Sequence, residues 1–303
     1  MNKSQRENKR TALVTGATGF VGSHLVRRLV KNEWNVNVIV RPSSNLDQLL
    51  ETRDAAIVHL HDGTMDGVNE ILEQTQPDVV FHLASLVGSE HQSADVEPLI
   101  LSNVLFGTQL AEAMVNTGCP CMVNVGTFWQ HYRGESYDPV NLYAATKQAF
   151  EDILQYYIQA KGLNVITLKL FDTYGPDDPR PKLFHFLKSL EDRGVPLDMS
   201  PGEQLVDFVF IDDVVEAFML AAERLRTESF AGYERYVVSS GQPIRLKDLV
   251  ELFSKITDKT IKVNWGGRAY REREVMVPWN AGRTLPGWSV KIHLEDGIKK
   301  LLS

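Results

Sequence analysis

The sequence predicts an α/β fold built on a doubly wound parallel sheet, and two patterns carry this prediction. Short runs rich in Val and Ile alternate with amphipathic stretches through the first half of the 303-residue chain. The runs lack polar alternation, which is typical of parallel strands buried on both faces. Strands that alternate with helices in this way are joined by right-handed crossovers and form such a sheet.

The expected elements follow in chain order. We expect strands at residues 11–16, 35–40, 56–61, 78–85, 121–126 and 164–171, and helices at 22–33, 65–75, near 95–116 and at 142–162. After residue 171 the stretch DTYGPDDPRPK is dense in turn-forming residues, and the regular alternation ends. A strand and helix in LVDFVFIDDVVEAFMLAAERL and a strand in RYVVSSG are then expected to return the chain to the sheet.

Composition limits the function classes. The chain is 43% hydrophobic and 23% charged, as folded globular proteins are, and no apolar run approaches the length of about 18 residues that spans a membrane. The start MNKSQRENKR has no apolar segment behind it, so no signal peptide is expected and the cytoplasm is the expected location. A net charge of −7 argues against a nucleic-acid partner. Cys119 and Cys121 are too close for an ordinary disulfide, lack metal-ligand spacing, and are expected to be buried free thiols.

A glycine-rich turn, TGATGFVG, follows the first expected strand and opens the first expected helix. Gly16, Gly19 and Gly22 leave room for a pyrophosphate at the positive helix N-terminus and for close packing of helix on strand. This arrangement is typical of a Rossmann-type dinucleotide-binding domain, and the missing Gly-Lys-Ser/Thr ending excludes a P-loop. The alternative is a glycine-rich turn without a ligand. The further cofactor contacts expected from this turn are Thr18, Phe20 and Val21.

The end of the second strand indicates which dinucleotide binds. Arg41 stands where an acidic residue would grip the ribose 2′-hydroxyl of NAD, and Ser43 and Ser44 follow it. An Arg there accommodates a 2′-phosphate, so NADP(H) is the preferred cofactor and NAD(H) is the alternative. A third interpretation is that Arg41 only caps the end of the strand. Asp62 and Gly63 end the third strand, where they are expected to meet the adenine, although an Asp-Gly turn would look the same.

Tyr143 and Lys147 in LYAATKQAF are four residues apart on an expected helix, so both side chains lie on one face. We expect the ammonium to favour the phenolate and to lower the Tyr143 pKa from about 10 toward neutrality, making Tyr143 a proton donor or acceptor. Thr127 ends the fifth strand, at the sheet edge where ligands of open α/β folds bind. Its hydroxyl is expected to hydrogen-bond a carbonyl oxygen that Tyr143 protonates. A surface Tyr-Lys pair without chemistry is the alternative.

With these residues in view, the chain resembles the extended short-chain dehydrogenases/reductases of the nucleotide-sugar epimerase/dehydratase group over nearly all of residues 11–302. FHLAS, NVLFGTQL, LFDTYGP, VDFVFIDDV and LPGWSVKIHLEDGIKKLL add to the resemblance. It implies a catalytic triad of Thr127, Tyr143 and Lys147, with Lys147 also holding the nicotinamide ribose. It also implies a nucleotide-sugar substrate and a homodimer formed through the Tyr143 helix and the long helix before it. The cofactor contacts that it adds are Leu83, Ala84, Ser85, Asn103 and Phe171.

Departures from the group's pattern narrow the expected activity. The 4,6-dehydratases of the group carry Asp-Glu after the catalytic Thr to move protons, whereas Phe128 and Trp129 follow here, so dehydration is not expected. Epimerases of the group usually keep NAD bound, whereas Arg41 points to exchangeable NADPH, so net reduction is expected. TFWQHY and LYAATKQAFEDIL most resemble the CDP-3,6-dideoxyhexose synthases, 4-ketoreductases of O-antigen sugar biosynthesis. An NAD-dependent nucleotide-sugar epimerase and a dinucleotide sensor without catalysis are the alternatives.

The substrate contacts rest on position. Trp129 and His131 follow the strand end and are expected to line the sugar pocket, with packing as the alternative for Trp129 and a secondary proton-donor role open to His131. The group's Arg before Asp-Phe is Val206 here, and the Asn of its Asn-x-Tyr-Gly-Pro is Asp172, which is expected to face the substrate. Pyrophosphate binding is therefore expected to shift to Arg271 or Arg273 in YREREVMVP, unless these belong to a solvated charge run.

These features divide the chain into three parts. We expect a disordered tail at residues 1–10, a dinucleotide-binding Rossmann-type domain at 11–175 and 206–240, and a smaller, discontinuous C-terminal substrate-binding lobe at 176–205 and 241–303.

Overall fold

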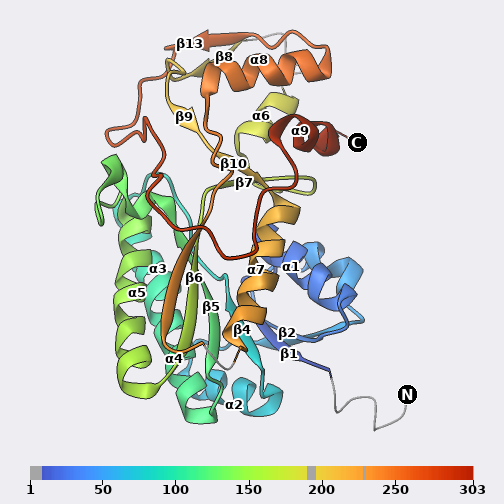
Figure 1. The fold of residues 1–303 in the computed structure, drawn as a ribbon, viewed down its shortest axis with the longest axis vertical. Coiled ribbons are helices and arrows are strands. Elements are labelled where there is room, and N and C mark those ends of the chain that lie inside the picture. Colours follow the sequence, from blue (N-terminus) through green and yellow to red (C-terminus); the bar gives the residue numbers. More distant parts are fainter. Residues whose placement is uncertain (1–8, 190–195, 228–229, 303) are drawn as a thin grey trace.

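A computed structural model describes residues 9–189, 196–227 and 230–302, and its centre is a parallel sheet (Figure 1). The sheet has seven strands in the order β11-β6-β5-β4-β1-β2-β3, which confirms the predicted doubly wound α/β fold. Chain order reverses between β1 and β4, which is where open sheets of this kind bind ligands at the carboxyl ends of their strands. The strands are β1 (Thr11–Thr15), β2 (Asn35–Val40), β3 (Ala56–Leu60), β4 (Val79–His82), β5 (Cys121–Thr127), β6 (Asn164–Leu170) and β11 (Tyr233–Val238).

Helices cover both faces of this sheet. The helices α1 (Phe20–Lys31) and α7 (Ile211–Leu225) share one apolar cluster, and α2 (Met65–Thr75), α4 (Phe106–Thr117) and α5 (Leu142–Lys161) share the other. Successive residues of β1 serve the two clusters in turn: Ala12 and Val14 belong to the first and Leu13 to the second. A parallel strand buried on both faces is apolar at every position for this reason.

One expectation about the sheet was wrong. We expected every strand to be buried on both faces, but Ile57 and Leu60 of β3 are 62% and 65% exposed. Among the described strands β3 pairs with β2 alone, so it forms the edge of the sheet. The connection from β2 to β3 contains the short 3-10 segment η2 (Asp47–Thr52), which packs against α1.

The smaller lobe lies beyond the carboxyl ends of the strands (Figure 1). Two short strands, β7 (Asp172–Tyr174) and β10 (Phe208–Phe210), pair in parallel where the chain passes from the sheet to the lobe and back. As predicted, α7 and β11 return the chain to the sheet. The lobe contains α6 (Leu183–Ser189), α8 (Leu246–Thr257) and α9 (Leu294–Leu302), with β8 (Leu197–Met199) paired to β13 (Val263–Trp265) and β9 (Leu205–Val206) paired to β12 (Ile244–Arg245).

Part of the segment 241–303 also packs on the sheet domain. The backbone N–H of Val237 donates to the carbonyl of Arg283 at 2.9 Å, and the indole N–H of Trp288 donates to the carbonyl of Asp213 at 2.8 Å. These contacts fasten the C-terminal segment along β11 and α7 before it reaches α9. The domain boundaries that we assigned from the sequence stay a prediction.

The long helical segment in the middle of the chain contains an irregular turn. It runs through α3 (Val96–Ile100), the π-helical turn η4 (Leu101–Leu105) and α4. Among the described helices, the stretch Ser93–Thr117 is long and apolar enough by length and composition alone to cross a membrane. Here it packs against α2 and α5 and buries Asn103 and Leu110, as a helix of a folded layer does.

Two smaller predictions concern the tail and the cysteines. Of the predicted tail 1–10, residues 1–8 lie outside the described residues, while Arg10 forms an ion pair with Glu223 and lies over the Trp34 ring. Cys119 and Cys121 are free and buried, as predicted, and burial raises the pKa of both thiols.

Candidate active site

The glycine turn between β1 and α1 has no room for side chains. Gly16 has a φ of +70°, and a Cβ there would lie 2.6 Å from the Ala84 backbone nitrogen. A Cβ on Gly22 would lie 2.1 Å from the Gly16 carbonyl oxygen, so helix and turn touch through bare backbone. No described side chain caps the start of α1 at Gly19, and its first turn carries no acidic residue. The Gly19 N–H donates to the Gly16 carbonyl at 3.0 Å. The backbone N–H groups in the first turn of α1 have no acceptor within the helix and can bind an anion such as a pyrophosphate.

The ends of β2 and β3 carry the residues expected at the adenosine. Arg41 and Ser43 are exposed, and the Ser44 hydroxyl accepts the Arg41 backbone N–H at 3.1 Å, which closes a turn around them. The Asp62 carboxylate accepts both the backbone N–H and the hydroxyl of Thr64, at 2.8 and 2.7 Å, and these bonds lower its pKa. Asp62 thus stabilises the turn after β3, which was the alternative to an adenine contact. Its contact with adenine stays a prediction.

Asn103 organises the loop that follows β4. Its side-chain oxygen accepts from the Ser85 hydroxyl at 3.1 Å and from the Leu86 backbone at 2.7 Å. Its side-chain nitrogen donates to the Leu86 carbonyl and to the Thr146 hydroxyl, both at 2.9 Å. Asn103 is fully buried in the π-helical turn η4, a feature frequent at functional sites. The structure thus gives Asn103 the task of holding the 85–86 loop to α5, and its direct contact with a cofactor stays a prediction.

The backbone of this loop also lies against the glycine turn. The Ala84 N–H donates to the Thr15 hydroxyl at 3.1 Å, and the Leu83 N–H donates to the Thr15 carbonyl at 3.2 Å.

Phe171, another expected cofactor contact, is buried and stacks on Phe128 with ring centroids 4.6 Å apart.

The three residues expected to be catalytic come together at the ends of β5 and α5. Thr127 closes β5, and Asn141 caps α5 by accepting the Ala144 N–H at 2.9 Å, so Tyr143 lies in the first turn of the helix. The hydroxyls of Thr127 and Ser85 lie near the Tyr143 phenol and act to lower its pKa. Lys147 follows one turn later and is buried. The structure thus gathers three hydroxyls beside a buried ammonium.

One electrostatic expectation was wrong. We expected Lys147 to lower the Tyr143 pKa toward neutrality, but burial raises this pKa to about 12, against the hydroxyls of Ser85 and Thr127 and the charge of Arg180. The Lys147 pKa is itself lowered to about 8 by burial. Desolvation disfavours the charged form of each group and outweighs the attraction that we had expected. At neutral pH Tyr143 is therefore a neutral phenol that can donate a proton.

Two buried nitrogen atoms near the site have no hydrogen-bond partner among the described residues: Lys147 Nζ and His82 Nε2. The other ring nitrogen of His82 pairs with the Thr15 hydroxyl at 2.9 Å, and burial with the nearby Lys147 charge lowers the His82 pKa to about 3. A buried ammonium without hydrogen-bond partners is energetically costly, and hydroxyl groups of a bound ligand would supply these partners to Lys147. Together with the glycine cradle at Gly16 and Gly22, this fits a dinucleotide whose nicotinamide ribose reaches Lys147.

The predicted substrate residues differ in their surroundings. Trp129 is partly buried, edge-on to Tyr143 with ring centroids 6.3 Å apart. His131 is buried, stacks on Trp279, and uses both ring nitrogens within the protein, one toward Lys169 Nζ at 2.8 Å and one toward the Glu135 carbonyl at 3.1 Å. Burial and the Lys169 charge lower the His131 pKa to about 4. His131 is therefore neutral, and the structure gives no support to its proton-donor role.

Asp172 and Arg271 carry charges at the rim of the site. Burial raises the Asp172 pKa, while Lys182, 3.8 Å away, opposes this shift. The charge of Arg271 also acts on Asp172, and its guanidinium lies 3.8 Å from Glu90. Their contacts with a substrate stay predictions.

Sequence analysis missed several residues of this site. Arg180 lies over the Phe20 ring at 4.6 Å and donates to the Thr173 carbonyl, and its charge acts on Tyr143. We had assigned its segment to a Pro-rich loop only. Gln130 was also missed, although Thr-x-x-Gln after a strand is the pattern of a capping box, which the structure contains at Thr127.

Comparisons with known proteins agree with this geometry. The family model described as NAD dependent epimerase/dehydratase family matches residues 12–238. CDP-abequose synthase of Salmonella muenchen is 27% identical over 299 residues, covering 96% of each chain. CDP-abequose synthase of Salmonella typhimurium is 25% identical over 303 residues, covering 97% of this chain and 98% of that protein.

Solved structures show the same fold. UDP-glucose 4-epimerase of Thermotoga maritima with UDP-glucose has a TM-score of 0.84 at 22% identity, over 96% of this chain and 97% of that one. UDP-glucuronic acid 4-epimerase of Bacillus cereus, solved with a fluorinated UDP-glucuronic acid and NAD, has a TM-score of 0.81 at 25% identity over the same shares. The family model covers most of this chain, including the glycine turn and the residues Thr127, Tyr143 and Lys147. This protein therefore belongs to the NAD dependent epimerase/dehydratase family, as an extended short-chain dehydrogenase/reductase that uses a dinucleotide to modify nucleotide sugars.

Proposed function

We propose that this protein reduces the 4-keto group of a nucleotide-linked deoxysugar with NADPH, and that CDP-4-keto-3,6-dideoxyglucose is the first substrate to test. The observation that carries the proposal is the aromatic pair after Thr127. Phe128 is buried and stacked on Phe171, and Trp129 lies against Tyr143. Neither side chain transfers a proton, so the positions that serve water elimination in the group's dehydratases have no such chemistry here. The similarity to CDP-abequose synthases supports the same reading.

The side chains divide the work of a carbonyl reduction. A bound nicotinamide supplies the hydride. Tyr143, a neutral phenol, protonates the developing alkoxide, and Thr127 orients the carbonyl oxygen through its hydroxyl. Lys147 holds the nicotinamide ribose and its charge favours the phenolate that Tyr143 leaves behind.

The cofactor proposal rests on Arg41. Its exposed guanidinium at the end of β2 suits a 2′-phosphate, and the Ser43 hydroxyl beside it adds a hydrogen-bond donor. The Bacillus cereus relative was solved with NAD, so NADH is the comparison that every assay needs.

We assign the sugar to the cavity beside Tyr143. It is lined by Leu86, Glu90, His91 and Asn141 as well as Tyr143, and its volume is about 160 Å³. Arg271 pairs with Glu90 at its rim, which supports a role for Arg271 in binding the substrate's phosphates.

We further propose a cytoplasmic homodimer. Apolar side chains lie exposed along the outer face of α3 and η4, where Ile100, Leu101 and Leu105 are 43%, 47% and 45% exposed. Tyr156, on the neighbouring α5, is 56% exposed. Exposed apolar groups along the outer face of a helix suit a contact with a second copy.

The test follows the near-ultraviolet absorbance of NADPH, and separately of NADH, with CDP-, dTDP-, GDP- and UDP-linked 4-ketosugars. We expect oxidation of NADPH, faster than of NADH, with one of them. The alternative function is that of an NAD-dependent epimerase, which the similarity to the Bacillus cereus enzyme supports. Folded protein that oxidises neither dinucleotide, retains NAD through purification and interconverts sugars without added reductant would refute the reductase. Folded protein that binds dinucleotide and does neither would be a sensor.

A further inference from the structure

A buried glutamine holds the backbone of Thr127. The Gln130 side-chain oxygen accepts the Thr127 backbone N–H at 2.9 Å, and the Thr127 hydroxyl accepts the Trp129 N–H at 3.3 Å. Gln130 is fully buried. Its amide is oriented by its own nitrogen, which donates to Glu151 at 2.9 Å and to Gln148 at 2.7 Å. The position of the Thr127 hydroxyl thus depends on what holds Gln130.

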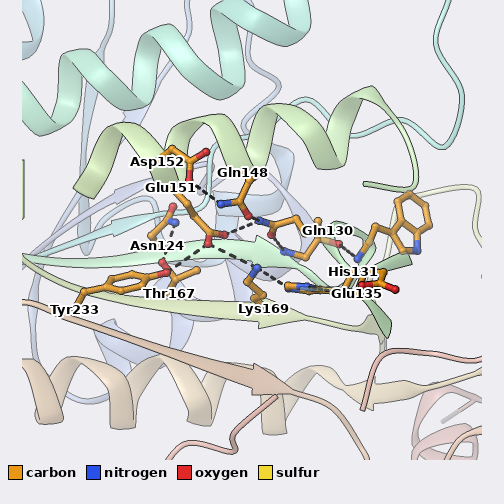
Figure 2. Close-up of polar contacts among 12 residues, drawn as sticks. Asn124, Gln130, His131, Glu135, Gln148, Glu151, Asp152, Thr167, Lys169 and Tyr233 are labelled. Carbon is orange, nitrogen blue, oxygen red and sulfur yellow. Dashed lines mark hydrogen bonds and ion pairs between the residues drawn. The ribbon is translucent and has the colours of Figure 1, made fainter. Parts of the chain in front are cut away.

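Glu151 holds it from α5, one turn after Lys147. Figure 2 shows Glu151 pointing from the helix toward the sheet, where Gln130, Lys169 and Tyr233 reach it. The second carboxylate oxygen lies 3.6 Å from Lys169 Nζ and accepts the Tyr233 hydroxyl at 3.3 Å. A Cβ on Gly126 would lie 2.8 Å from the Glu151 carboxylate, so a larger residue there would displace the Glu151 side chain.

The cluster contains more positive than negative charge. Lys147 and Lys169 are both fully buried. Glu151, 3% exposed, follows Lys147 by four residues on the same face of α5 and lies 3.6 Å from Lys169 Nζ, so its charge acts on both. Lys169 donates to His131, which is neutral and therefore does not offset the charge of either lysine. The other titratable or charged groups that face this cluster are Asp152 on α5, His82 on β4, and Tyr233 and Arg235 on β11.

We propose that Glu151 is a positioning residue for the reaction proposed above: it fixes the Gln130 amide that holds Thr127, and it supplies the buried counter-charge that keeps Lys147 an ammonium. A single carboxylate thereby connects the oxygen-orienting hydroxyl to the ribose-holding lysine. The inference rests on the proposed function for its catalytic meaning, while the charge coupling is a property of the ligand-free protein.

The alternative is a Glu151 that only fills space between α5 and the sheet. Glu151→Gln separates the two, because it keeps the shape and an oxygen for Gln130 but removes the charge. The direct readout is the titration of Lys147 by NMR of protein with ¹³C-labelled lysine, without cofactor or substrate. The Lys147 resonance is assigned by its loss in Lys147→Met.

We expect the Lys147 pKa, about 8 in the native protein, to fall by about one pH unit in Glu151→Gln, because the opposite charge one helical turn away is removed. Lys169→Met removes the competing ammonium and is expected to move the same pKa upward. Gln148→Ala is the matched control, because it removes the other acceptor of Gln130 and no charge. It should leave the titration unchanged. Opposite shifts in two variants of one cluster do not arise from loosened packing.

The second readout is the pH profile of kcat for ketosugar reduction. In Glu151→Gln its alkaline limb should move to lower pH by the same amount, with KM within about twofold of the native value. An unchanged Lys147 titration in folded Glu151→Gln overturns the proposal, as does a kcat loss equal at every pH. If Glu151→Gln does not fold, a downward or absent shift in Lys169→Met overturns it instead. A titration that moves as expected in a protein that reduces no ketosugar refutes the proposed function and leaves the charge coupling standing.

Discussion

Replacing Lys147 by Met is expected to stabilise the ligand-free protein near neutral pH while destroying its function. The side chain is 1% exposed, and burial lowers its pKa from 10.5 to about 8. Each pH unit corresponds to about 1.4 kcal/mol, so keeping the charged form inside the fold costs about 3 kcal/mol. Met fills similar space without a charge. The trade of stability for function is common at active sites.

The pH dependence gives this prediction its sign. In the unfolded chain Lys147 titrates near 10.5, and in the fold near 8. The cost is therefore fully present below pH 8, shrinks as the pH rises between the two values, and vanishes above 10.5. The advantage of Lys147→Met should be about 3 kcal/mol at pH 7, a rise in Tm of about 5 °C or more, and should fade toward alkaline pH.

Thermal and urea unfolding of both proteins from pH 6 to pH 10 measure this difference. Lys161→Met at the exposed end of the same helix is the control, and its Tm and urea midpoint should equal those of the native protein at every pH. Equal or lower stability of folded Lys147→Met at pH 7 would show that Lys147 is not held as a costly ammonium, and the electrostatic account of the site would be wrong.

Four further outcomes test the site. Tyr143→Phe should lower kcat by about a thousandfold, since general acid catalysis contributes about 10²–10⁴, and leave NADPH affinity, measured by fluorescence, nearly intact; normal turnover contradicts the mechanism. Gly22→Ala places a Cβ 2.1 Å from the Gly16 carbonyl oxygen, so calorimetry should detect no tight dinucleotide binding, whereas native affinity would contradict the cradle. Arg41→Ala should weaken NADPH about tenfold, for one lost charge-assisted contact, and spare NADH; equal losses would remove Arg41 from the 2′-phosphate. Leu101→Asp should convert a dimer to monomers in light scattering, and an unchanged mass would exclude the η4 face.

The sequence was sufficient for features that depend on local pattern. The periodicity of Val and Ile located the strands, and the glycine turn was identified because strand and helix flank it. Tyr143 and Lys147 were found because four-residue spacing fixes a shared helix face whatever the tertiary context. The strand β3 was predicted, but its exposed position at the edge of the sheet was not, because its residues are as apolar as those of a central strand and only the strand order reveals an edge.

Properties that depend on several distant segments were missed for a different reason. Glu151 looks like a surface residue of an amphipathic helix, and only its packing against β6 and β11 reveals a buried carboxylate. The Tyr143 pKa depends on how much water the folded chain removes, which no spacing encodes. Asn103 in the π-helical turn likewise donates to Thr146, 43 residues later, a contact that no local pattern encodes.

The protonation state of Tyr143 relates the two rival activities to one observable. Reduction begins with a neutral phenol that gives its proton to an alkoxide, whereas epimerisation of a sugar alcohol begins with a phenolate that takes a proton from a hydroxyl. Burial holds the Tyr143 pKa at about 12, so the ligand-free site starts in the form that reduction needs. The positive charge that opposes this shift is that of Arg180, while Lys147, with a pKa of about 8, is partly neutral in mild alkali. The ligand-free site is therefore in the protonation state with which the proposed reduction begins.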